Sequence, residues 1–189
     1  MEVSPSDEEL ANLAARGERT AFEVLVRRHK GAFFAFVRRY IGQRDDAHDV
    51  LQDAFLAAWL ALNRYDPSRP FLPWLRTIAL NKCRDFGRRQ KVRRLLLLAK
   101  AAEPEPESIP SLDINAPDAI EALRLQRLDA AITALPGFYK EPLLLTAVSG
   151  LSHMEAAALL KTTPKAVEMR LRRARQRLAK AIGEGDAEG

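Results

Sequence analysis

The chain has 189 residues, of which 47% are hydrophobic and 29% charged, with a formal net charge of +5. This composition is typical of a folded protein and excludes fibrous and disordered classes. Its apolar runs are far shorter than the roughly 20 residues that cross a bilayer, and the acidic N-terminus lacks the basic start of a secretion signal. We therefore expect a cytoplasmic protein. Cys83 is the only cysteine, which excludes an intrachain disulfide and a cysteine-built zinc site.

The charge is unevenly distributed along the chain. From Lys82 to Arg94 there are seven Lys or Arg and one Asp, and from Lys161 to Lys180 there are eight Lys or Arg and one Glu. Both blocks are typical of surfaces that face phosphate groups. The segment from Ala101 to Asp118 instead holds five carboxylates and no Lys or Arg, so we expect it to avoid DNA.

The first hundred residues predict four helices. Ser6 and Glu9 have the spacing of a capping box, and Gly17 ends this first helix. Apolar residues at spacings of three and four predict a second helix from Phe22 to about Ile41, which Gly42 stops. A third helix begins at the acidic pair 45–46 and a fourth at Trp74.

The segment 65–75, YDPSRPFLPWL, separates the third and fourth helices. It holds three prolines and three aromatic rings in eleven residues. The prolines restrict the backbone, so the sequence predicts a stiff loop with aromatic side chains. Two roles are open for Phe71 and Trp74: contact with a ligand, or anchoring of the loop in the core.

A linker and a second helical domain are expected after this point. The segment 96–118 is rich in proline and carboxylates and lacks an apolar period, which predicts a flexible acidic linker. The segment 119–183 then predicts amphipathic helices. We expect an all-α protein of two small helical domains, residues 1–95 and 119–183, with no cofactor and no metal.

The last two predicted helices form a helix-turn-helix. Ser152 and Glu155 give a second capping box, and Thr163 followed by Pro164 is a cap with proline at the first helical position. Arginines surround the second of these helices, which would let it lie in a major groove of DNA. Residues near its N-terminus would be nearest the bases, and the later arginines nearest the backbone.

The whole chain apart from the linker and tails resembles the extracytoplasmic-function (ECF) sigma factors of bacterial RNA polymerase. The segment DAHDVLQDAFLAAWLALNRYDPSRPFLPWLRTIALNKCRDFGRRQK is similar to the promoter-melting domain of that family. The segment ALPGFYKEPLLLTAVSGLSHMEAAALLKTTPKAVEMRLRRARQRL is similar to its second DNA-binding domain. The resemblance implies a sigma factor that binds core polymerase, recognises the minus-10 and minus-35 promoter elements and promotes strand opening, with no catalytic residues.

The resemblance assigns residues to the minus-10 element, where the family holds a base flipped out of the non-template strand. A rigid pocket suits this role, because an extruded base loses stacking and pairing that the pocket must offset. The implied minus-10 residues are Tyr65, Asp66, Ser68, Arg69, Phe71, Asn81, Lys82, Arg84, Arg88 and Arg89.

The resemblance also implies a minus-35 surface on the last helix. Its residues are Lys165, Glu168, Met169, Arg170, Arg172, Arg173, Arg175 and Arg177. Many members of the family have a basic residue and a serine where this chain has Glu168 and Met169. Glu168 could accept a hydrogen bond from a cytosine amino group or pair with neighbouring arginines.

The partners implied are core RNA polymerase, promoter DNA and an anti-sigma factor. An acidic ridge of Asp46, Asp49, Gln52 and Asp53 would dock on the clamp helices of the beta-prime subunit, with a solvated helix face as the plain alternative. The acidic linker would run toward the path of the emerging RNA, near the beta subunit, or serve only as a tether.

Two other classes of function are open from sequence. A free-standing helix-turn-helix regulator would use only the C-terminal domain and leave the N-terminal half without a role. A metal-dependent nuclease would use the carboxylates at positions 45, 46, 49 and 53, but the chain lacks an obvious base or a second ligand cluster.

Overall fold

The computed structural model describes residues 5–100 and 117–186, and side chains over most of these ranges. The chain is all-α in these parts, which confirms the expected class, and its helices form two domains. The first domain contains α1 (Asp7–Ala15), α2 (Arg19–Ile41), α3 (Arg44–Ala61), the short 3₁₀ helix η1 (Leu62–Arg64) and α4 (Phe71–Lys100). The second contains α5 (Pro117–Ala134), α6 (Gly137–Ala147), α7 (His153–Leu160) and α8 (Pro164–Asp186).

The helix ends follow the predicted local signals. The side chain of Ser6 accepts a hydrogen bond from the Glu9 amide, and Glu9 accepts one from the Ser6 amide, which completes the capping box of α1. Ser152 and Glu155 do the same for α7. Gly42 follows α2 with φ of 96°, a conformation that suits glycine.

The fourth helix is longer than the sequence predicts. It begins at Phe71 rather than Trp74 and continues to Lys100, beyond the expected domain end at residue 95. The early start has a physical cause, because the Phe71 amide donates a hydrogen bond of 3.2 Å to the Glu8 carboxylate of α1. This bond satisfies one of the unpaired donors of a helix N-terminus. The expected linker over 101–116 lies outside the described residues.

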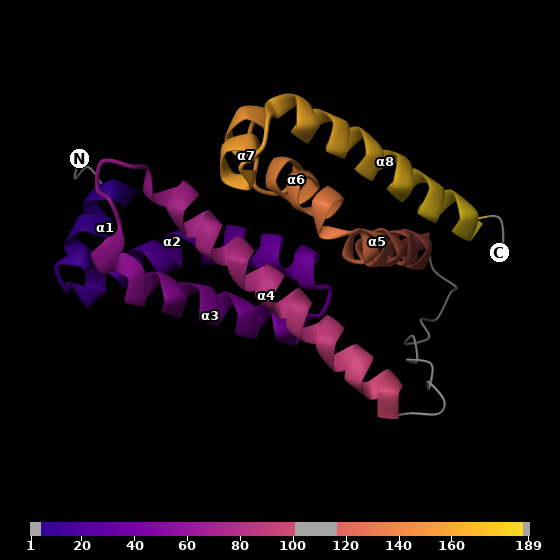
Figure 1. The fold of residues 1–189 in the computed structure, drawn as a ribbon, viewed down its shortest axis with the longest axis horizontal. Coiled ribbons are helices and arrows are strands. Elements are labelled where there is room, and N and C mark those ends of the chain that lie inside the picture. The colour runs from indigo at the N-terminus through magenta and orange to yellow at the C-terminus, as the bar shows by residue number, and fades with distance from the viewer. Residues whose placement is uncertain (1–4, 101–116, 187–189) are drawn as a thin grey trace.

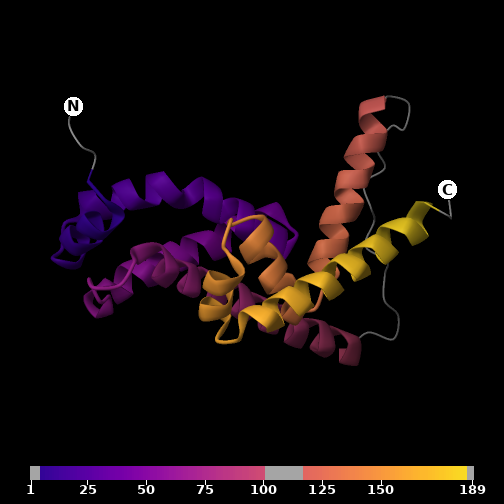
Figure 2. The same ribbon diagram turned by 90° about the horizontal axis from the view of Figure 1, so that it is seen from above.

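The second domain lies against one side of the first (Figure 1), and α5 and α6 pack against α2. Large buried side chains include Leu25, Phe71 and Leu75 in the first domain and Leu144 and Val167 in the second. The buried residues of both domains form one continuous cluster. Seen from above, α5 and α8 extend away from the first domain at an angle to each other (Figure 2).

Candidate nucleic-acid interface

The loop between η1 and α4 is braced by its own hydrogen bonds. The Tyr65 hydroxyl donates to the Arg69 carbonyl at 2.5 Å. The Asp66 carboxylate accepts from the Ser68 amide at 3.0 Å and from its hydroxyl at 2.7 Å, and it pairs with Arg69 at 3.2 Å. The bonds from Ser68 lower the pKa of Asp66. These contacts, together with the prolines, fix the loop before any ligand binds.

The aromatic rings lie beneath this loop rather than on its outer face. Tyr65 is 6% exposed and Phe71 is 0% exposed, and their rings meet edge to face with centroids 5.7 Å apart. Trp74 is half-buried and packs on both rings. Phe71 has no exposed surface in this arrangement, and its implied contact with a base stays a prediction. The polar residues Asp66, Ser68 and Arg69 are exposed.

The basic residues of α4 differ in their accessibility. Asn81, Arg88 and Arg89 are exposed, and Lys82 is half-buried. Arg88 forms an ion pair with Asp85 one turn away. Arg84 is engaged by the Glu141 carboxylate of the second domain, and it also donates a hydrogen bond of 3.3 Å to Asn81.

The predicted acidic ridge lies on the outer side of α3. Asp49, Gln52 and Asp53 are exposed, and Asp46 is half-buried. The three carboxylates of the ridge line a groove of about 300 Å³ together with Arg89 and Arg93 of α4. The ridge is therefore accessible, and two arginines of the same domain line the groove beside it.

The helix-turn-helix has the predicted turn. Lys161 adopts a left-handed conformation with φ of 52°, and the Thr163 hydroxyl accepts a hydrogen bond of 3.2 Å from the Ala166 amide at the start of α8. Val167 and Leu171 bury one side of α8 against its domain. Most of the other described side chains of α8 are exposed.

The arginines of α8 fall into two groups. Arg170 is half-buried with its guanidinium 3.8 Å above the ring of Phe138, and Arg177 lies 4.9 Å above the ring of Tyr139. Such stacking orients an arginine within its own domain. The exposed predicted residues that lie outside these two stacks are Lys165, Glu168, Met169, Arg172, Arg173 and Arg175.

Sequence reasoning missed three features of this region. These are the Glu8 contact to Phe71, the stacking of arginines on α6, and a buried Lys140–Glu141 pair that faces the first domain. The available signal for the last was two adjacent charges beside the apolar run 142–145.

Within residues 5–100 and 117–186, no three His, Cys, Asp or Glu side chains converge on a position that could hold a metal ion. The nuclease alternative therefore has no metal-binding group in this part of the chain. The same residues include no helix with the length and apolar content needed to span a bilayer.

Comparison with known proteins places these features in one family. Residues 25–93 match Sigma-70 region 2 and residues 125–178 match Sigma-70 region 4. The chain is 39% identical to the RNA polymerase sigma factor CnrH of Cupriavidus metallidurans over the full length of both proteins. It is also 31% identical to the ECF RNA polymerase sigma factor SigM of Mycobacterium tuberculosis, over 94% of this chain and 85% of SigM. The chain is an ECF sigma factor.

A solved structure supports the same assignment for the fold. CnrH in complex with the cytosolic domain of CnrY superimposes with a TM-score of 0.70 and 36% identity, over 97% of this chain and 99% of CnrH. The sigma factor therefore binds core RNA polymerase, recognises promoter elements and promotes strand opening. This function accounts for both domains, whereas a free-standing regulator leaves the first one without a role.

Proposed function

We propose that the sigma factor melts the minus-10 element with the rim of its braced loop. The observation that carries this proposal is the loop geometry: Tyr65 and Phe71 support it from below, while Asp66, Ser68 and Arg69 are presented outward. A loop that is already formed loses little entropy when it captures an extruded base. Asn81 would read an edge of that base, and Lys82, Arg84, Arg88 and Arg89 would hold nearby phosphates.

The same proposal assigns the minus-35 element to α8. Lys165, Glu168 and Met169 are exposed near its N-terminus, where a helix in the major groove meets the bases. Arg172, Arg173 and Arg175 would grip the backbone. Arg170 and Arg177, which stack on aromatic rings of α6, would act mainly by positioning the residues that contact DNA.

Core polymerase would dock on the acidic ridge of α3. Asp49, Gln52 and Asp53 are exposed and lie on one helical side with Asp46. Like charges on one face favour a basic partner, and the clamp helices of beta-prime are that partner in this proposal. The two functional domains would comprise residues 1–95 and 119–183, with the segment between them running toward the beta subunit and the RNA path.

An anti-sigma factor would regulate the chain. CnrH, which this sigma factor matches along its full length, has been solved with the cytosolic domain of CnrY. A small polypeptide of that kind would hold this sigma factor away from polymerase. The protein would act in the cytoplasm as a binding subunit without catalytic activity of its own.

Transcription in vitro tests the proposal. Purified chain is mixed with sigma-free core polymerase and a pool of genomic promoter fragments, and RNA starts are sequenced. Starts that share upstream elements at two fixed positions are expected, and they should disappear without the chain. Absence of both core binding and specific starts would overturn the proposed function.

A further inference from the structure

The contact between the two domains is built around two charged residues of α6. Lys140 and Glu141 are each 8% exposed, although charged side chains are seldom buried to this degree unless they are paired. Both side chains reach the first domain, at the end of α2 and the middle of α4. Their burial therefore depends on the two domains remaining together.

Glu141 accepts hydrogen bonds from side chains on two helices of the first domain, α2 and α4. The Arg84 Nε atom donates to Oε1 of Glu141 at 2.8 Å, and Arg84 Nη2 donates to Oε2 at 2.6 Å. The Tyr40 hydroxyl donates to the same Oε1 at 3.3 Å. Two parallel bonds between a guanidinium and a carboxylate are among the strongest polar contacts in proteins. These bonds raise the pKa of Arg84, and burial raises that of Tyr40.

Lys140, which precedes Glu141 in α6, also contacts the first domain. Its Nζ atom donates to the Tyr40 carbonyl at 3.2 Å and to the Thr133 carbonyl, and it lies 5.0 Å from the centre of the Tyr40 ring. Gly42 lets the end of α2 lie close to α5, because a Cβ atom at this position would lie 2.7 Å from Cγ2 of Thr133. We call the group Tyr40, Arg84, Lys140 and Glu141 the clasp.

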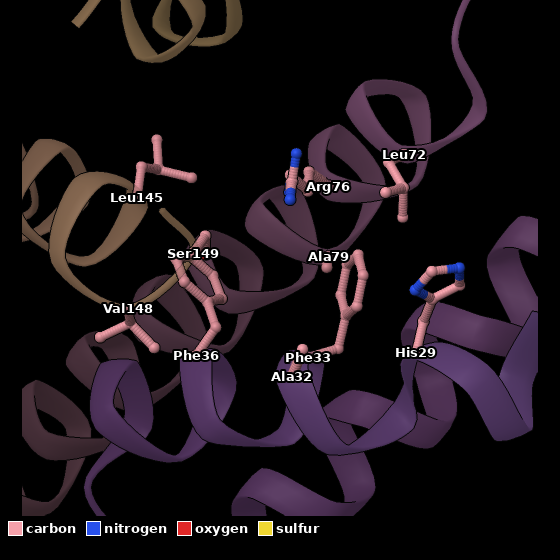
Figure 3. A pocket seen from close by; sticks show the side chains of 10 residues that line it. All are labelled: His29, Ala32, Phe33, Phe36, Leu72, Arg76, Ala79, Leu145, Val148 and Ser149. Carbon is pink, nitrogen blue, oxygen red and sulfur yellow. The ribbon is translucent and has the colours of Figure 1, made fainter. Parts of the chain in front are cut away.

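The apolar side chains between the two domains leave part of the interface unfilled. A cavity of about 100 Å³ lies between α2, α4 and the end of α6 (Figure 3). Phe33 and Phe36 line it from the first domain, and Leu145 and Val148 line it from the second. An interface that leaves such a space unfilled gains less from packing than a domain core does. The polar contacts of the clasp therefore add to an apolar interface that is not fully packed.

The closed arrangement occupies part of the proposed minus-10 surface. Arg84, which the proposed function assigns to a DNA phosphate, already forms an ion pair with Glu141. A second groove is formed jointly by Arg69 and Trp74 beside the loop and by Glu155 and Leu159 of α7. The helix-turn-helix domain therefore flanks the surface that single-stranded DNA would have to reach.

We infer that the clasp is an autoinhibitory contact: Glu141 substitutes for a DNA phosphate on Arg84 and keeps the free sigma factor closed until core polymerase separates the domains. This inference rests on the proposed role of Arg84 at the minus-10 element. The opening itself can be measured without that role.

Cys83 supplies a reporter of opening within the natural chain. It is the only cysteine and is 0% exposed, and the charges of Glu141 and Lys140 are near enough to influence its thiol. Burial raises the pKa of this thiol to about 12, so it should react slowly with a thiol reagent while the clasp is closed. We therefore expect the rate of Cys83 labelling in the full chain to rise when the domains separate.

The decisive variant is Glu141→Gln, which keeps the shape of the side chain and removes its charge. The matched control is Glu23→Gln, which makes the same charge change in an exposed ion pair with Arg19. We expect Glu141→Gln to label Cys83 at least about tenfold faster than wild type, and to increase the radius of gyration in small-angle scattering, with unchanged helix content. The control should match wild type.

A double-mutant cycle keeps the test valid if one variant is also less stable. Arg84→Gln leaves the Glu141 carboxylate without its cation and should open the clasp as Glu141→Gln does. The double variant should then open no further than either single variant, because both remove one interaction. Equal labelling rates in wild type and both single variants would overturn the clasp, as would fully additive effects.

A DNA-binding measurement tests whether the closed clasp inhibits binding of DNA. With a pool of fluorescein-labelled single-stranded DNA, Glu141→Gln should bind at least about tenfold more tightly than Glu23→Gln. An opened chain with no such gain would refute autoinhibition while leaving the clasp in place. Failure of the proposed function would look different, because wild type would then start no RNA with core polymerase although Cys83 labelling still responded to Glu141→Gln.

Discussion

Replacing Phe71 with leucine separates support of the loop from contact with DNA. The ring of Phe71 is fully buried and makes aromatic pairs with Tyr65 at 5.7 Å and with Trp74 at 5.6 Å. Each such pair contributes about 0.5–1.5 kcal/mol beyond the burial of area. Phe71→Leu keeps an apolar side chain but loses both pairs, so we expect the first domain to lose about 2 kcal/mol of stability.

Urea denaturation measures this loss in the correct domain. Both tryptophans, Trp59 and Trp74, lie in the first domain, so their fluorescence follows its unfolding. With an m-value of about 2 kcal/mol per molar urea, the midpoint should fall by about 1 M. Phe138→Leu is the matched control, because Phe138 is 56% exposed in the second domain and its loss should leave this midpoint unchanged.

Promoter opening should follow the same variant. At a temperature where Phe71→Leu remains folded, a loosened loop should give several-fold fewer open complexes, measured by permanganate reactivity of unpaired thymines. Fewer open complexes with an unchanged urea midpoint would refute our reasoning, since that result would mean that the ring touches the base directly.

Three further predictions follow from the other surfaces. Asp49→Arg combined with Asp53→Arg should abolish core polymerase binding in a pull-down while circular dichroism stays unchanged; retained binding would exclude the ridge as the docking surface. Arg172→Ala should weaken binding of holoenzyme to minus-35 duplex DNA by about tenfold and reduce its salt dependence, as expected for a lost phosphate contact; an equal affinity would remove Arg172 from the interface. The pKa of Cys83 is raised from its ordinary value near 9 to about 12 in the folded chain, so its contribution to stability is complete below pH 9 and is lost as pH rises toward 12; Cys83→Ala should therefore lose melting temperature more slowly than wild type between these pH values, and parallel curves would contradict the assignment.

Local signals made the secondary structure predictable. The two capping boxes depend on residues three apart, and Gly42 stops α2 because its own backbone adopts positive φ. Each of these features is encoded within one turn of helix. The resemblance to ECF sigma factors is likewise carried by continuous segments, and the comparisons confirm it.

Contacts between distant segments were not predictable in this way. The start of α4 at Phe71 depends on Glu8, which lies 63 residues earlier in the chain. The burial of Glu141 depends on Arg84, 57 residues earlier. Prolines also interrupt the apolar period around Phe71, so sequence alone left open whether its ring lay inside or outside. Only the packed structure resolves that choice.

The bond from Glu8 to the Phe71 amide has a consequence for the beginning of the chain. The first helix has no assigned contact with DNA, yet Glu8 in it binds the N-terminus of the helix that follows the loop proposed to capture a base. Any change that moves α1 away from the start of α4 would therefore make the preceding loop less rigid. Sensitivity of transcription to changes near the N-terminus would then reflect a lost brace, rather than a lost contact with the promoter.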